Sequence, residues 1–113
     1  MATSRLVPED PAAFLRRCVA EGRVFWSYHA RVRLKQRTVT QEMILESAGQ
    51  YEIIESNPDD KYLPSYLVLS RHTGIQFHVL FAADIAGGNI RVVTAYLPDK
   101  TQWEDDLRTR RTP

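Results

Sequence analysis

The sequence predicts an α+β fold in one domain, with helices first, an antiparallel meander of about four strands next, and a short helix at the end. Apolar residues recur at helical spacing before Gly49 and alternate with polar residues after it. Short turn signals, at residues 72–74 and 86–89, separate consecutive alternating stretches, and such turns join antiparallel neighbours. No repeat and no linker divides residues 1–113, so one domain is expected.

Three helices are expected in the first half of the chain, each preceded by a residue that can cap its first turn. The caps are Asp10, Ser27 and Thr40. The first helix is an N-terminal extension over about residues 10–22 and ends at Gly22. The second starts after Ser27 and is interrupted by the β-branched residues 38–40. The third covers residues 41–48.

Four strands are expected in the second half of the chain, bounded by turn and loop residues. Their ranges are 51–56, 65–71, 75–83 and 90–97. Pro98 and Asp99 then start the expected C-terminal helix, which includes Trp103 and Leu107. Helices would cover one face of the sheet, and the other face would be partly open to water.

Two of these strands carry polar side chains of chemical interest. Alternation in the third strand places His78 opposite the apolar core face, where it could line a cleft or pack beneath a loop. Alternation in the fourth strand places Thr94 and Tyr96 on one face with Ile90 and Val92. Tyr96 lies near the strand end, a rim position for a functional hydroxyl, although threonine and tyrosine are also favoured in strands for packing reasons.

Composition and motifs exclude several classes of protein. A formal net charge of +1, with 43% hydrophobic and 26% charged residues, is typical of a globular protein. No apolar run approaches the ~20 residues that cross a membrane, and the N-terminus lacks the apolar core of a signal peptide, so a cytoplasmic protein is expected. The single cysteine, Cys18, permits no internal disulfide. The three histidines lack metal-binding spacing and no nucleotide-binding motif is present, so no metal or cofactor is expected.

The stretch S-Y-H-A-R-V-R-L-K-Q-R, at the start of the second expected helix, holds four cations and one histidine without an acid. On a helix, His29, Arg33 and Arg37 form one stripe because they are spaced by four. Like charges at this spacing slightly destabilise a helix, so stability does not explain them. A histidine beside two guanidiniums suits phosphate binding. The alternative is a solvated helix face, and Arg31 and Lys35, which form a second set, are interpreted as ordinary solvated charge.

Five separated blocks of the sequence resemble a known family. They are S-Y-H-A-R-V-R-L-K-Q-R-T-V-T-Q-E-M-I, Y-E-I-I-E-S, P-S-Y-L-V-L, I-Q-F-H-V-L-F-A-A-D and I-R-V-V-T-A-Y-L-P-D. In this order they resemble the bacterial family called domain of unknown function 4258, over about residues 25–105. The resemblance implies the RelE-like fold of the small bacterial ribonuclease toxins, the barnase–EndoU–colicin–RelE group. The family usually has a glycine after the second arginine, where this chain has R-T-V-T, and residues 10–22 lie outside the resemblance.

The polar positions of that family fall on residues that their spacing also singles out. They are His29, Arg33, Arg37, His78, Thr94 and Tyr96. The first hypothesis is a metal-independent, toxin-like ribonuclease in which the arginines and Thr94 bind the scissile phosphate. One histidine would act as general base on a ribose 2′-hydroxyl, and the other histidine or Tyr96 would act as general acid. This mechanism requires His29 and His78 to meet across a cleft between helix and sheet.

Two other functions stay open on the sequence. A non-catalytic module on the same fold would bind nucleic acid or protein through the basic stripe, with the histidines structural. An immunity-like protein would instead present the region 41–60, which holds six acids and no base. If the chain is a toxin, the expected partners are RNA and a small antitoxin-like protein. No membrane partner is expected.

Overall fold

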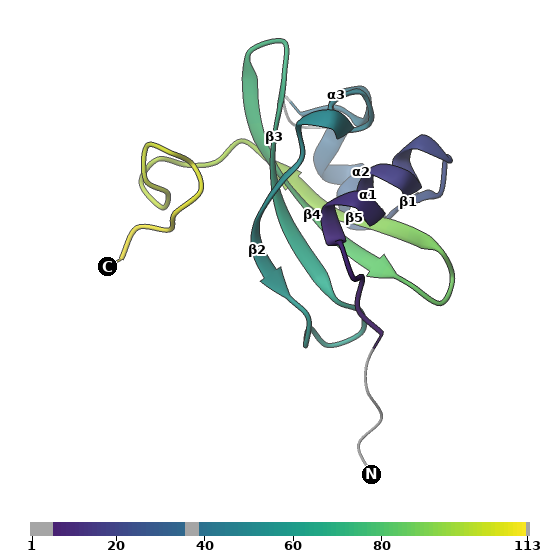
Figure 1. Cartoon of the computed structure of the whole chain (residues 1–113). Coiled ribbons are helices and arrows are strands. Elements are labelled where there is room, and N and C mark those ends of the chain that lie inside the picture. Colours follow the sequence, from purple (N-terminus) through teal and green to yellow (C-terminus); the bar gives the residue numbers. More distant parts are fainter. Residues whose placement is uncertain (1–5, 36–38, 113) are drawn as a thin grey trace.

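A five-stranded mixed sheet is the centre of the fold (Figure 1). The computed structural model describes residues 6–35 and 39–112. The strands are β1 (Val24–Trp26), β2 (Glu52–Asn57), β3 (Ser65–His72), β4 (Ile75–Asp84) and β5 (Asn89–Tyr96). The helices are α1 (Pro11–Ala20), α2 (Tyr28–Lys35), α3 (Gln41–Glu46) and the 3₁₀ turn η1 (Ala48–Gln50). The predicted α+β class is therefore confirmed.

The predicted capping residues begin the three helices. Each side chain accepts a hydrogen bond from the backbone N–H three residues later: Asp10 from Ala13 at 3.1 Å, Ser27 from Ala30 at 3.0 Å and Thr40 from Met43 at 3.1 Å. These bonds satisfy donors that have no partner within the helix itself. The third helix ends two residues before the expected Ala48, where η1 replaces its last turn.

The sheet has the strand order β1-β5-β4-β3-β2. Strands β2 to β5 form the predicted antiparallel meander. The prediction of a purely antiparallel, four-stranded sheet is wrong, because β1 adds a fifth strand parallel to β5. With three residues, β1 is too short to show an alternating pattern.

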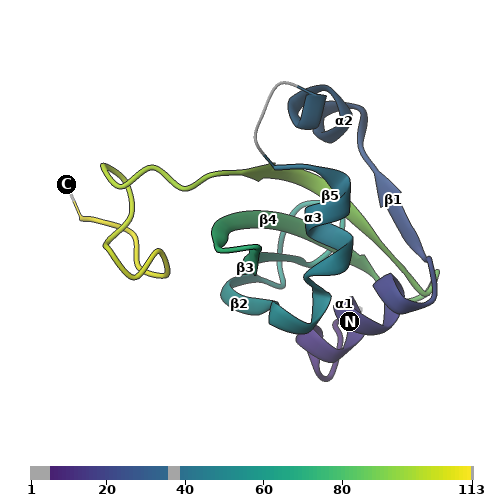
Figure 2. The same cartoon turned by 90° about the horizontal axis from the view of Figure 1, so that it is seen from above.

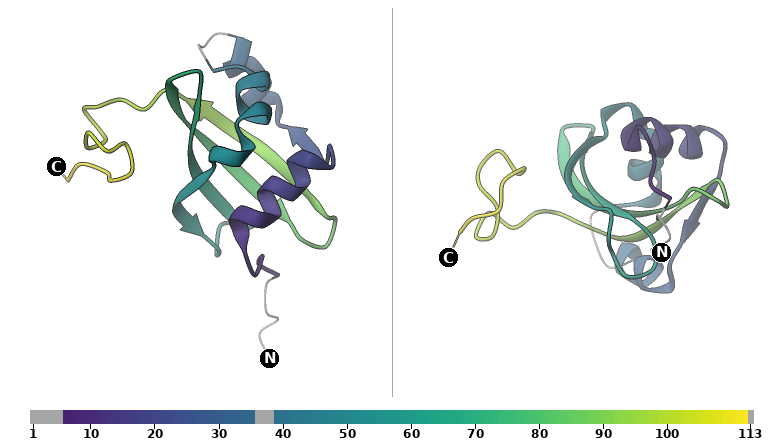
Figure 3. Two further views of the ribbon diagram at one scale, coloured as in Figure 1. Left: turned by 45° about the horizontal axis from the view of Figure 1, so that its top comes forward. Right: turned by 60° about the horizontal axis from the view of Figure 1, so that its bottom comes forward.

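Different parts of the chain pack on the two faces of the sheet. Figures 2 and 3 show α1 and α3 on one side of the sheet and the C-terminal segment continuing from the end of β5. Helices α1 and α3 pack on one face, which we call the helix face, and build the larger core with strand side chains that share this face. Those side chains include Val68, Phe77, Val79, Phe81 and Val92, each with no exposed surface. The C-terminal segment, residues 97–112, packs against β2, β3 and β4 on the opposite face, where Leu67 and Leu69 contact Trp103 and Leu107.

A β-bulge in β5 reverses part of the predicted strand alternation. The register pairs Leu80 with Thr94 but Phe81 with Val92, so Val93 is the extra residue. Val92 therefore lies on the helix face, whereas Thr94 lies on the opposite face. The prediction that Thr94 and Tyr96 share a face with Val92 is wrong, and the bulge is the physical reason.

The predicted C-terminal helix is also wrong. The backbone N–H of Trp103 bonds to the Asp99 carbonyl at 3.0 Å, which closes one turn, but the chain then forms further turns and a bridge between Trp103 and Arg110. Asp106 Oδ1 accepts hydrogen bonds from the backbone N–H groups of Arg108 and Thr109 at 2.8 and 3.0 Å. Aspartate side chains that bond to nearby backbone in this way compete with helix formation.

Candidate functional site

His78 lies at the centre of the contact between the sheet and the C-terminal segment. Its side chain has no exposed surface. Its Nε2 atom lies 2.7 Å from the carbonyl oxygen of Leu107, and its Nδ1 atom lies 3.2 Å from the Tyr96 hydroxyl. The Trp103 indole meets the imidazole edge to face, with ring centroids 4.5 Å apart. His78, in the middle of the sheet, thus holds the irregular C-terminal segment against the sheet.

These contacts determine the tautomer of the neutral His78 ring. A carbonyl oxygen only accepts, so Nε2–H donates to Leu107 and Nδ1 accepts from the Tyr96 hydroxyl in the neutral ring. Burial lowers the pKa of His78, and the Leu107 hydrogen bond and the charge of Glu55 oppose this effect only in part. Burial also raises the pKa of Tyr96. Both ring nitrogens are occupied, so His78 is not available as a general base in this conformation.

The buried imidazole predicts a loss of stability in acid. The folded-state pKa of His78 is lowered, so the unfolded chain binds the additional proton once the pH falls below about 6.5. Stability should then decrease with falling pH by up to about 1.4 kcal/mol per unit from this one group. Urea unfolding at several pH values from 7.5 to about 5 measures this change in the free energy of unfolding. The variant His78→Gln should show a shallower decrease than the wild type, and equal slopes would contradict the assignment.

Arginines of the C-terminal segment form ion pairs with acids of the edge strand β2. Arg108 pairs with Glu52, and Arg110 Nε lies 2.6 Å from a Glu55 carboxylate oxygen. The Arg110 guanidinium also lies over the Trp103 ring, 4.6 Å from its centroid. Because Glu52 and Glu55 are neutralised from within the chain, part of the acidic region 41–60 is not free for a partner protein. This weakens the immunity-like alternative.

The basic stripe of α2 occupies a different part of the molecule. His29 is exposed, Arg33 is half-buried, and Arg37 lies outside the described residues. Figures 1, 2 and 3 show α2 apart from the C-terminal segment that covers His78. In the described part of the chain, no hydrogen bond or ion pair joins His29 or Arg33 to Tyr96 or His78. The structure brings together His78 and Tyr96 from two strands, but it does not connect them with the stripe.

The other cations of α2 line a hollow that the sequence did not reveal. This open hollow of about 520 Å³ lies between α2, β1 and the start of α3. It is lined by Trp26, Arg31, Leu34, Lys35, Thr40 and Gln41. Arg31 and Lys35 therefore line this hollow. From the sequence alone they are interpreted as ordinary solvated charge. Ala30 and Leu34 are the buried residues of α2. Helical geometry places Arg31 and Lys35 on one flank of this buried side, and His29 and Arg33 on the other.

Exposed aromatic side chains lie on the same two elements, α2 and β1. Tyr28 opens α2 with 84% of its surface exposed, and Phe25 on β1 is 57% exposed. Phe25 is paired in register with the exposed Arg91 of β5. Large apolar rings in water beside unpaired arginines are a common feature of surfaces that bind nucleic acid.

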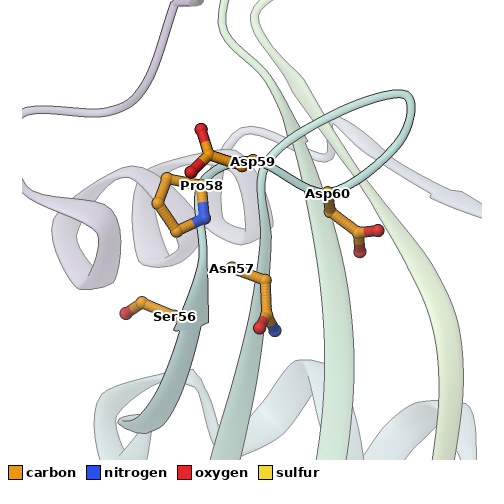
Figure 4. A pocket seen from close by; sticks show the side chains of 5 residues that line it. All are labelled: Ser56, Asn57, Pro58, Asp59 and Asp60. Atoms are coloured by element: carbon orange, nitrogen blue, oxygen red, sulfur yellow. The ribbon is translucent and has the colours of Figure 1, made fainter.

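A second hollow surrounds the loop after β2 and offers no comparable chemistry. It has a volume of about 570 Å³ and is lined by Ser56, Asn57, Pro58, Asp59 and Asp60. In Figure 4 the carboxylates of Asp59 and Asp60 point away from each other. Asp60 already accepts hydrogen bonds from the Ser65 hydroxyl at 2.7 Å and from the Lys61 backbone N–H at 2.8 Å. Among the described residues, no group of three histidine, cysteine or acidic side chains could hold a metal ion.

Comparison with known proteins identifies the family. Residues 26–101, more than half of the chain, match the family described as domain of unknown function (DUF4258). The chain belongs to this family. No curated protein and no solved structure matches it. The DUF4258 region contains α2, His78 and Tyr96, whereas α1, Trp103 and Leu107 lie outside it. No helix within the described ranges is long and apolar enough to cross a membrane.

Proposed function

We propose that the protein binds single-stranded RNA through the basic surface formed by α2 and β1. A contrast between two groups of cations carries the proposal. Arg108, Arg110 and Arg111 of the C-terminal segment all pair with acids of the same chain. Arg31 and Arg33, by contrast, have no ion pair among the described residues, and α2 contains no acid. Unpaired cations on one helix are available for the phosphates of a nucleic acid.

The exposed rings favour single strands over duplexes. Tyr28 and Phe25 can stack only on bases that are not already stacked within a helix. The sequence blocks resemble DUF4258, and that resemblance implies a fold like that of the small bacterial ribonuclease toxins, so RNA is the ligand to test before DNA. A basic surface that binds only through charge would not distinguish a single strand from a duplex.

Removal of the α2 cations tests the proposal. The triple variant Arg31→Ala, Arg33→Ala and Lys35→Ala should bind a labelled single-stranded oligoribonucleotide more weakly. The slope of log affinity against log salt should become shallower by about 2, since each phosphate contact to a single strand contributes about 0.7. Fluorescence anisotropy at several salt concentrations measures both quantities.

The C-terminal arginines provide the matched control. Arg108→Ala, Arg110→Ala and Arg111→Ala change the net charge equally but remove cations that are already paired. The control should retain most of the affinity and the salt slope. Equal losses in the two triple variants, or no binding by the wild type, would refute the proposed function.

A metal-independent ribonuclease on the same surface is the second candidate. The exposed His29 favours it, because this imidazole lies one helical turn from Arg33. His29 would take the proton of a ribose 2′-hydroxyl, and the oxygen would attack phosphorus. The bond to the 5′-oxygen would break, and that oxygen would take a proton from solvent water. The buried His78 could supply that proton only if the C-terminal segment left the sheet. An RNA cleavage assay with EDTA, comparing the wild type with His29→Gln, decides between cleavage and binding alone.

A further inference from the structure

We infer that the hollow lined by Trp26, Arg31 and Lys35 is a subsite for one unstacked nucleotide of the bound RNA. The base would lie against the Trp26 indole, and the two cations would hold its phosphate. This inference rests on the proposed function and adds a location and a mode of recognition to it. The charge pattern of the sequence did not indicate this location, since Arg31 and Lys35 were interpreted as ordinary solvated charge.

Trp26 provides a fixed aromatic surface. It is the last residue of β1, paired in register with Val92, and it is half-buried against the larger core. The next backbone N–H, of Ser27, donates to the Val92 carbonyl at 3.1 Å, and the Ser27 hydroxyl donates to the Val93 carbonyl at 3.1 Å. The backbone directly after Trp26 is therefore held against β5 by two hydrogen bonds. A ring that is already positioned loses little conformational entropy when a base stacks on it.

The polar wall of the hollow has the charge that a phosphate requires. Arg31 and Lys35 are spaced by four on α2, so both project toward the same side of the helix. Both are exposed, and neither forms an ion pair with another described residue. Gln41, exposed at the start of α3, can donate to and accept from the edge of a base.

The size and composition of the hollow also fit a nucleotide. A volume of about 520 Å³ lies within the range of small-molecule sites in proteins. Leu34 supplies an apolar wall, Trp26 an aromatic one, and the two cations a charged one. A free mononucleotide offers the same chemistry as one residue of RNA, so the experiment has to separate these two sources.

Tryptophan fluorescence provides the test. The chain has two tryptophans, so in Trp103→Phe the remaining signal comes from Trp26 alone. Single-stranded oligoadenylate should quench this signal in a saturable manner, and an oligomer of equal length with abasic positions should quench it much less. Adenosine monophosphate should need a higher concentration than the oligomer, because it lacks the neighbouring phosphates. Quenching by the mononucleotide at a lower concentration than by the oligomer would overturn the assignment to RNA.

Substitution of the ring separates this inference from the proposed function. Trp26→Leu should weaken binding of the oligomer roughly 5- to 100-fold, the effect of removing one stacked base. It should also reduce the preference for the normal over the abasic oligomer, whereas Trp26→Phe should retain most of both. If the wild type and Trp26→Leu bind equally well and only the α2 triple variant loses affinity, the subsite is wrong and RNA binding stands. If the wild type does not bind RNA, the proposed function fails as well. Should Trp26→Leu not fold, the abasic comparison in Trp103→Phe still decides.

Discussion

Replacement of Trp103 with alanine should lower the free energy of unfolding by about 3–5 kcal/mol, the usual range for removal of a buried aromatic side chain. Only 2% of the Trp103 surface is exposed. The indole contacts the imidazole of His78 on one side and the guanidinium of Arg110 on another. Alanine would leave a cavity among these groups and the apolar side chains of Leu67 and Leu69. Urea unfolding followed by far-ultraviolet circular dichroism measures the change.

Tyr62→Ala is a suitable control for this substitution. Tyr62 is an aromatic residue with 81% of its surface exposed, so its removal should change stability by less than about 0.5 kcal/mol. A change below about 1 kcal/mol for Trp103→Ala would show that the C-terminal segment does not contribute to the cooperative fold. Limited trypsin digestion provides an independent readout, because a released segment would be cut after Arg108 and Arg110.

The sequence contained enough local information for the helices and the meander, but not for the additional strand or the C-terminal segment. Capping by Asp10, Ser27 and Thr40 depends on bonds that span three residues, which a local pattern can show. Pairing of β1 with β5 joins residues 66 positions apart, such as Val24 and Ile90, and leaves no local signal in a strand of three residues. The bulge at Val93 also leaves no local signal, because the extra residue is apparent only from the pairing of β5 with β4.

The candidate site was predicted in part for the same reason. Helical spacing divides the cations of this segment into two sets, and in the structure Arg31 and Lys35 of one set line the hollow. It could not show which set borders a hollow, because that depends on where β1 and α3 lie. The sequence left open whether His78 lines a cleft or packs beneath a loop. The structure shows it beneath the C-terminal segment, and local patterns could not decide because Trp103 and Leu107 follow it by more than twenty positions.

Replacement of His78 with alanine is the second change with a large expected effect. It would leave the Leu107 carbonyl without its partner in a buried site and the Tyr96 hydroxyl without its partner in a partly buried one. Each buried polar group without a partner costs about 1–3 kcal/mol, so the total should be about 2–6 kcal/mol. The conservative variant His78→Gln can still donate to the Leu107 carbonyl and should lose less. Equal losses for alanine and glutamine would show that packing, rather than hydrogen bonding, determines the effect.

A double-mutant cycle would establish whether His78 and Trp103 act as one unit. Their rings are in contact, so the double variant should lose less stability than the two single variants added together, with a coupling energy of about 0.5–3 kcal/mol. His78→Ala combined with Tyr62→Ala should be additive within about 0.5 kcal/mol, because those side chains share no contact. Coupling of the first pair would identify His78 as the attachment point of a segment that lies outside the DUF4258 region. Additive losses would show that the two side chains contribute to stability independently. His78 would then not attach the C-terminal segment through its contact with Trp103.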